Sequence, residues 1–194
     1  MRSWAAAPRV TDTRAVPRSV HAFEQPDRFV AGTVGVPGDR SFYLQARDGS
    51  RVISVLLEKA QVALLANKVD ELLDMARRRG GDIPGVVPRT VEDTGPLDSP
   101  VDEEFRVGAL ALGWDPEREV VVIEALAQSE ATEDPVEAFT DVGEGPDALR
   151  VALSPLAARA FARRAERVVA AGRPPCMLCN QPLDPAGHQC PRLN

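Results

Sequence analysis

The chain has 194 residues, of which 44% are hydrophobic and 27% are charged, and these are the proportions of an ordinary folded protein. No apolar run reaches the roughly 18 to 20 residues that a membrane span requires, so we expect no membrane partner. The net charge of −6 argues against a general nucleic-acid binder, because neutralising phosphates requires clustered lysine and arginine. All three cysteines lie between Cys176 and Cys190, too few for a disulfide framework, which favours a reducing cytoplasm with thiolates bound to a metal.

The charge is unevenly distributed along the chain. Residues 150–194 contain seven arginines against two acidic residues, about +5, whereas residues 91–147 contain seventeen acidic residues against two arginines, about −15. The carboxyl-terminal part could therefore meet an anionic partner, either another molecule or the acidic middle of the same chain.

The first half of the chain begins with a segment that lacks hydrophobic periodicity. Residues 1–18 contain two prolines, and we predict a disordered N-terminal extension there. Four short β-rich runs follow, at residues 19–23, 28–35, 41–47 and 51–57. Turn-forming residues separate them, and Asp48-Gly49 is a strong hairpin signal because both turn positions tolerate positive φ. The pattern predicts four antiparallel strands.

The hydrophobic period changes after Glu58. Apolar residues recur at helical spacing from Val62 to Ala76, and the run ends at Gly80-Gly81, which predicts an amphipathic helix. A loop rich in Pro, Gly and Asp follows, to about residue 100.

The second half shows the same succession of strands and a helix. Strands are predicted at residues 104–112, 119–128 and 148–153, with an acidic stretch before the last of them. A second amphipathic helix then begins, with Ser154 as N-cap and Pro155 at the first helical position.

The two halves are similar in sequence. Phe29 and Gly32 match Phe105 and Gly108 at an offset of 76 residues, and apolar positions of the two predicted helices match at an offset of 96. We therefore predict an α+β fold of two similar halves, each with antiparallel strands closed by an amphipathic helix, arranged as a pseudo-twofold pair of sheets that share a core. Chance coincidence of Val, Leu and Ala is the alternative. The predicted boundaries are 19–81 and 101–173 for the two units of one globular domain, and 174–194 for a zinc knuckle.

Candidate metal ligands are concentrated at the carboxyl end. Cys176 and Cys179 form a Cys-x-x-Cys turn that points both sulfur atoms inward, and His188 and Cys190 supply two more ligands after a short loop. Four protein ligands leave no coordination position for water, so we predict one structural Zn²⁺ without a catalytic role. Because so short a tail buries little apolar area, the metal should supply most of its folding free energy.

Two other interpretations of the cysteines stay open. One is a redox Cys-x-x-Cys with a spare cysteine, although that motif normally opens a helix in an α/β context, whereas here it follows a helix in a proline-rich tail. The other is an iron–sulfur cluster, which the histidine disfavours.

Arginines recur along the second predicted helix. Arg159, Arg163 and Arg167 lie four residues apart, Arg164 lies beside them, and Arg173 precedes the knuckle. A stripe opposite the apolar face is typical of a solvated helix surface. It could instead be a basic edge that continues onto the knuckle and grips a phosphate backbone or an acidic protein.

Three residues are candidates for a cleft between the halves. Arg106 and Glu124 interrupt apolar strands at positions that could face each other across a hairpin, either as a solvent-exposed pair or as polar groups in a cleft. Trp114, in a predicted turn, is either an exposed aromatic anchor or a lid over the core. A deep pocket lined by Arg106 and Glu124 would favour an enzyme of unknown reaction.

Several longer motifs carry a family resemblance. They are FEQPDRFVAGTVG at 23–35, FYLQA at 42–46, LEK at 57–59, EFRVG at 104–108 with GWD at 113–115, EGPDA at 144–148, and GRPPC at 172–176 with the residues up to 190. From about residue 20 to residue 192 the chain resembles the DUF3090 family, conserved bacterial proteins without an established function. The resemblance implies a family-wide Cys/His tail, but it brings no reaction, substrate or partner.

The function that we expect from the sequence is not enzymatic. It is that of a zinc-binding cytoplasmic protein that docks a protein or a nucleic acid through its basic C-terminal helix and its knuckle. The sequence does not decide between the two kinds of partner, and it does not give the oligomeric state.

Overall fold

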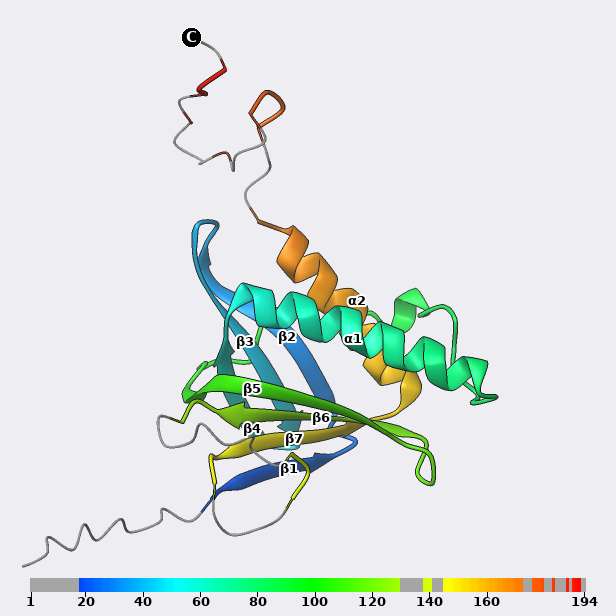
Figure 1. Ribbon diagram of the computed structural model, residues 1–194. Helices are drawn as coiled ribbons and strands as arrows, with labels where there is room; N and C mark the ends of the chain where they lie inside the picture. Colours follow the sequence, from blue (N-terminus) through cyan, green and yellow to red (C-terminus); the bar gives the residue numbers. More distant parts are fainter. Residues whose placement is uncertain are drawn as a thin grey trace, which may run out of the picture.

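The computed structural model describes residues 18–129, 138–140, 145–172, 176–179, 183, 188 and 190–192. Except for Arg18, the predicted N-terminal extension lies outside these residues, as does most of the acidic stretch. The described residues form an α+β fold, as predicted (Figure 1). The strands are β1 (Val20–Glu24), β2 (Arg28–Val36), β3 (Asp39–Asp48), β4 (Arg51–Leu57), β5 (Glu103–Asp115), β6 (Val120–Ala127) and β7 (Ala148–Leu153), the helices are α1 (Lys59–Arg78) and α2 (Pro155–Ala170), and a 3-10 turn covers Arg89–Val91.

All seven strands belong to one sheet, in the order β1-β7-β6-β5-β4-β3-β2. Neighbouring strands are antiparallel except for the pairs β1–β7 and β4–β5, which are parallel. The expectation of a pair of sheets was therefore wrong. A twofold axis between the two halves would pair a strand of one half with its equivalent in the other half. Here β4, the last strand of the first half, pairs with β5, the first strand of the second half. This parallel pairing needs a long crossover, which α1 and the following loop supply. Each set of three antiparallel strands is followed by a helix, and the sequence duplication stays a prediction.

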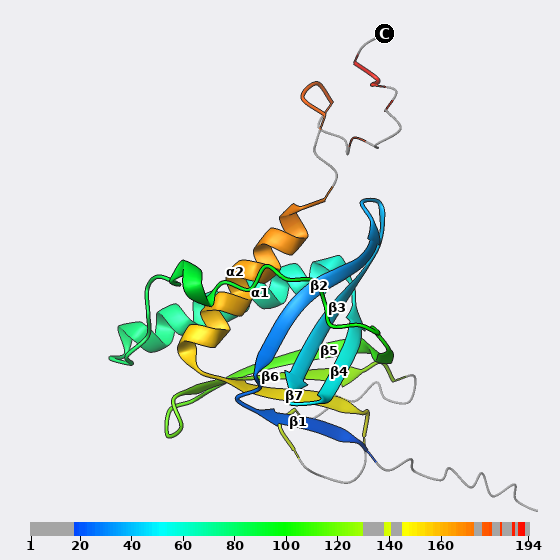
Figure 2. The same cartoon turned by 180° about the vertical axis from the view of Figure 1, so that it is seen from behind.

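The sheet is rolled so that its two edge strands meet at one corner. β1 and β2 lie at opposite ends of the strand order, but only residues 25–27 separate them in the chain. Gln25 turns this corner with a φ of 53°, and its backbone N–H donates to the carbonyl oxygen of Ala152, 3.0 Å away. Figures 1 and 2 show the consequence: β2, β3 and β4 stand at a steep angle to β5, β6, β7 and β1.

Both helices begin at a capping residue, and Ser154 is the one predicted. Glu58 and Gln61 form a capping box at α1, and the hydroxyl group of Ser154 accepts a hydrogen bond from the backbone N–H of Ala157 at α2, over 3.3 Å. The apolar residues of α1 that recur at helical spacing from Val62 to Ala76 are buried, apart from the half-buried Leu72, whereas Leu64 and Met75 are exposed. No helix in the described residues is both long enough and apolar enough to cross a membrane.

The core lies between the helices and one face of the rolled sheet. Phe29 of β2 stacks on Phe161 of α2, with ring centroids 4.7 Å apart. Alternate residues of the strands join this core, as the two-residue period of a strand requires.

The loop between α1 and β5 packs against the other face of the sheet. The fully buried side chain of Gln45 exchanges hydrogen bonds with the backbone of Asp98, accepting from N–H at 2.7 Å and donating to the carbonyl oxygen at 3.0 Å. Leu97 packs against Gly32 so closely that a Cβ atom at residue 32 would lie 2.5 Å from its Cδ2. The absence of a side chain at Gly32 is therefore what allows the loop to approach β2 so closely.

Candidate metal centre

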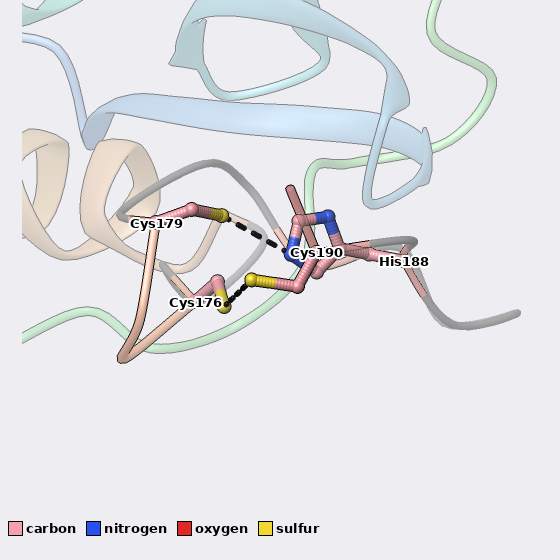
Figure 3. A group of neighbouring side chains, drawn as sticks. All are labelled: Cys176, Cys179, His188 and Cys190. Atoms are coloured by element: carbon pink, nitrogen blue, oxygen red, sulfur yellow. Dashed lines mark hydrogen bonds between the residues drawn. The ribbon is translucent and has the colours of Figure 1, made fainter. Parts of the chain in front are cut away.

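The described residues of the C-terminal tail bring together the four predicted ligands. The ligand atoms of Cys176, Cys179, His188 and Cys190 all lie within 4.8 Å of one another. Figure 3 shows the sulfur atoms and the imidazole ring directed toward a common point. Cys176 and Cys190 are buried although the tail is short.

Two of the distances between ligand atoms are close to those of a tetrahedral site. Sγ of Cys176 lies 3.9 Å from Sγ of Cys190, and Sγ of Cys179 lies 3.2 Å from Nε2 of His188. Ligands at zinc-like distances from a central ion, tetrahedrally arranged, are separated by roughly 3.3 to 3.8 Å. The four residues therefore fit one metal ion, with Nε2 as the histidine ligand atom.

The turn between the first two cysteines favours the ligating form of Cys176. Hydrogen bonds from the backbone N–H groups of Cys179 and Leu178 are the largest causes that lower the pKa of the Cys176 thiol, to about 6. Burial opposes this effect, whereas the side chains of His188 and Cys179 add to it. The thiolate is the form of cysteine that binds metals, so these backbone hydrogen bonds favour the metal-binding form of Cys176.

The same turn carries a fully exposed apolar side chain. Met177 is 99% exposed, and Leu178 beside it is 48% exposed. Arg192 donates from Nη1 to the carbonyl oxygen of Leu178 over 2.9 Å, which ties the end of the chain to the turn. The Cys-x-x-Cys spacing predicts the turn, but no pattern in the sequence predicts this exposure.

Two of the arginines predicted to bind a partner are buried. Arg159 is 4% exposed and reaches α1, where it donates to Asp70 at 3.1 Å and to Asp74 at 2.8 Å. Burial raises the pKa of Asp70, whereas the hydrogen bond from Arg159 lowers the pKa of Asp74. The placement of Arg159 opposite the apolar face was therefore wrong, because α1 packs over this side of α2.

Arg164 is the second buried arginine, with 6% exposure. It donates to the carbonyl oxygens of Ala31 and Gly95 and pairs with the Asp93 carboxylate at 2.5 Å. Burial lowers the pKa of Arg164, and Asp93 opposes this effect. Arg28 joins from β2, and its hydrogen bond is the largest cause that lowers the pKa of Asp93. Arg164 therefore holds the loop after α1, and its predicted exposure was wrong.

The other members of the predicted stripe differ from these two. Arg163 and Arg167 are exposed, and they pair with Glu166 and Glu92, both at 3.3 Å. Arg173 lies outside the described residues. The exposed part of the basic face is therefore smaller than predicted.

The three residues of the predicted cleft lie in three different places. Arg106 pairs with Glu58 at 2.7 Å and lines an open hollow of about 540 Å³ beside a bulge in β5, and Glu124 does not line this hollow. Glu124 faces Ala111 across the β5–β6 hairpin, so the predicted pairing with Arg106 was wrong. Val107 faces Ala127, the last residue of β6, so Arg106 lies beyond the point where β6 ends and far along the hairpin from Glu124.

Glu124 is instead the centre of a buried charge network on the sheet. It is fully buried, it pairs with Arg18 and with Arg150 at 3.4 Å, and it accepts a hydrogen bond from the backbone N–H of Phe139 at 2.6 Å. These partners fasten residues 138–140 to β6 and β7. No local motif marks this network, because its members are far apart in the chain.

Trp114 lies inside β5 and not in a turn. It packs against the core and lines a hollow of about 480 Å³ together with Leu72, Met75 and Arg79 of the α1 end. It therefore covers one end of the core, as one of its two predicted roles requires.

Comparison with known proteins identifies a family but not an activity. The family model described as "Protein of unknown function (DUF3090)" matches residues 21–190, a span that includes all four candidate ligands. No curated protein and no solved structure matches the chain.

Proposed function

Since the chain belongs to the DUF3090 family, whose description names no activity, we propose a function from the metal centre itself. The tail binds one structural Zn²⁺ through Cys176, Cys179, His188 and Cys190, and the closed knuckle presents its exposed turn to a macromolecular partner. The protein is then a non-enzymatic interaction protein. The observation that carries this proposal is a fully exposed Met177 between two cysteines whose sulfur atoms point at a common centre.

The donor set supports zinc as the ion. Three thiolates and one imidazole are a common structural zinc set, and soft sulfur ligands disfavour magnesium and calcium. The histidine among the four residues disfavours an iron–sulfur cluster, whose usual ligands are four cysteines.

The same geometry supports a structural and not a catalytic ion. When bound, the zinc cross-links the two ends of the tail and has no open coordination position for water or a substrate. None of the tail residues that the structure describes belongs to the core that spans Phe23 to Val169. Metal binding therefore provides the tail with folding free energy that apolar burial does not.

The exposed turn supports docking as the role of the folded knuckle. An unbranched methionine on a rigid turn adapts to an apolar pocket, and methionine is enriched at protein interfaces. Because Arg159 and Arg164 are engaged inside the protein, fewer arginines are free to meet phosphates, which favours a protein over a nucleic acid as the partner.

The proposal is tested first by metal analysis of the purified full-length chain. We expect one zinc per chain, lost in Cys176→Ser and retained in a control variant, Ser50→Ala, at an exposed position of the β3–β4 turn far from the tail in sequence. Binding is then tested with Met177→Asp, which keeps the ligands, against Val86→Asp, at a valine that is also strongly exposed in the loop after α1. Purified protein without zinc, or partner binding unaffected by Met177→Asp, would contradict the proposal.

A further inference from the structure

The hairpin that joins β2 and β3 carries exposed aliphatic side chains. Val36 is 67% exposed and Val34 is 46% exposed, both near the hairpin end. Gly35 and Gly38 have φ values of 101° and 106°, which shape this end. Valine side chains on an exposed hairpin are an apolar contact surface without a partner in the described residues.

Two cations converge where α2 ends. A Cβ atom placed on Gly172 would lie 3.2 Å from Nζ of Lys59 and 3.6 Å from Nη2 of Arg40, so the two side chains approach the same point from α1 and from the hairpin. Neither cation forms an ion pair within the described part of the chain. Glu58, next to Lys59, pairs with Arg106 instead.

The hairpin end, the two cations and the knuckle lie at the same end of the molecule. Figures 1 and 2 both show the end of the β2–β3 hairpin beside the last turn of α2. Cys176 follows Gly172 by four residues, and four residues span at most about 14 Å. Met177 follows Gly172 by five residues, so its Cα atom lies at most about 18 Å from that of Gly172, beside which Lys59 and Arg40 converge.

We infer that these features form one docking surface, and that it binds an acidic segment of a protein partner. The apolar contacts are Val34, Val36 and Met177, and the cations between them are Lys59 and Arg40. The inference rests on the proposed function, since the zinc-bound knuckle must be folded to place Met177.

Electrostatics supports an anionic occupant. Two like charges that approach one point repel each other. The carbonyl oxygen of Val169, 3.7 Å from the same Cβ position, and the Phe42 ring, whose centroid lies 5.6 Å from Cζ of Arg40, offset this repulsion in part. A carboxylate seated between Lys59 and Arg40 would remove the repulsion and make two charge-assisted hydrogen bonds.

The apolar groups favour a protein over a nucleic acid. Nucleic-acid surfaces use many phosphate contacts and aromatic side chains on which bases stack, whereas this surface has two cations and aliphatic side chains. Aliphatic contacts around a charged centre are typical of protein–protein interfaces.

Site-specific photo-crosslinking of the full chain in its own cells tests the inference. A photo-crosslinking residue replaces Met177, Val36 or, as a control outside the surface, Val86. We expect the same protein to be crosslinked from positions 177 and 36 and not from 86, through a peptide rich in Asp and Glu. Lys59→Glu or Arg40→Glu should reduce its yield about tenfold, and Lys68→Glu on the same helix should not.

The variants are chosen to fold. Position 59 begins α1, whose first turn has no acidic residue, so a glutamate there is favourable for the helix dipole. Four outcomes would each overturn the inference. They are crosslinks that persist in both Lys59→Glu and Arg40→Glu, a crosslinked second copy of the chain, a nuclease-sensitive product, and no crosslink at all. The zinc content of the same samples separates the two proposals. If the protein contains zinc and the crosslinks from position 177 are unchanged by Lys59→Glu and Arg40→Glu, only the composite surface is overturned. If the protein contains no metal, the proposed function is overturned.

Discussion

Arg164 of α2 donates a hydrogen bond from Nε to the backbone carbonyl oxygen of Ala31 in β2, over 2.7 Å. Because β2 pairs only with β3, this contact occupies an acceptor on the open edge of the sheet. At the other edge, Arg51 donates from Nη1 to the carbonyl oxygen of Ala22 in β1 over 3.0 Å. Guanidinium groups thus cover backbone acceptors at both edges, which hinders pairing with another chain.

Replacing Arg164 by alanine should destabilise the fold by about 2 to 4 kcal/mol, because the change leaves buried acceptors without a donor and Asp93 without a buried partner. Arg163→Ala, one residue away but exposed, should change the free energy of unfolding by less than about 0.5 kcal/mol. Urea denaturation of both variants measures the difference. Equal stability of the two would refute the structural role of Arg164.

Gly32→Ala should destabilise the protein because the added methyl group would overlap Leu97. Overpacking of this kind costs about 1 to 3 kcal/mol. Leu97→Ala alone should also destabilise, since it leaves a cavity, but it should make Gly32→Ala less harmful. A double-mutant cycle measured by urea denaturation should therefore give a coupling of about 1 kcal/mol or more, and additive effects would show that the two residues do not touch.

The lowered pKa of Asp93 predicts a loss of stability in acid. Its hydrogen bond with Arg28 holds the folded-state pKa below the ordinary value of 3.8. Stability from this carboxylate is therefore present above that pH and is lost as the pH falls through the lower folded pKa. Asp70 acts in the opposite direction, because burial raises its pKa. The unfolding free energy of Asp93→Asn should consequently fall less steeply below pH 4 than that of the native chain, and an exposed control, Asp102→Asn, should follow the native profile.

Patterns that are local in the sequence predicted most of the individual elements. The helix cap at Ser154, the two-residue and helical periods and the Cys-x-x-Cys turn all depend on neighbours a few positions away. The ligand set itself could be predicted because every cysteine and one of the two histidines of the chain lie between residues 176 and 190.

The pairing of distant elements could not be predicted in the same way. The parallel β4–β5 pair gives one sheet where two were expected, since strand partners are decided by packing and not by period. Arg159 looked solvent-exposed on an isolated helix, but α1 brings Asp70 and Asp74 to it from more than eighty residues away. Glu124 likewise forms ion pairs with Arg18 and Arg150, which are distant in the sequence and are brought to it by the pairing of the strands.

Glu124→Gln should loosen residues 138–140. The change removes the buried negative charge that holds Arg18 and Arg150 and weakens the acceptor for the Phe139 N–H. Breaking a buried charge network typically costs about 3 to 5 kcal/mol. Urea denaturation should show this loss, and limited proteolysis should cut faster near residue 139. Glu117→Gln, an exposed control, should have neither effect, and unchanged proteolysis of Glu124→Gln would refute the fastening.

Removing the metal should unfold the tail and leave the rest of the fold intact. Among the described residues the core lies between Phe23 and Val169, so its packing should not depend on the knuckle, whereas the knuckle takes its folding free energy from the metal. A chelator should therefore release zinc and make the tail accessible to protease, while the far-UV circular dichroism of the sheet and helices stays nearly constant. Cys179→Ser should resemble the chelated chain, and added zinc should restore protection in the native chain but not in this variant. A chelator that lowers the thermal midpoint of the whole domain as strongly as it exposes the tail would show instead that the knuckle is part of the core.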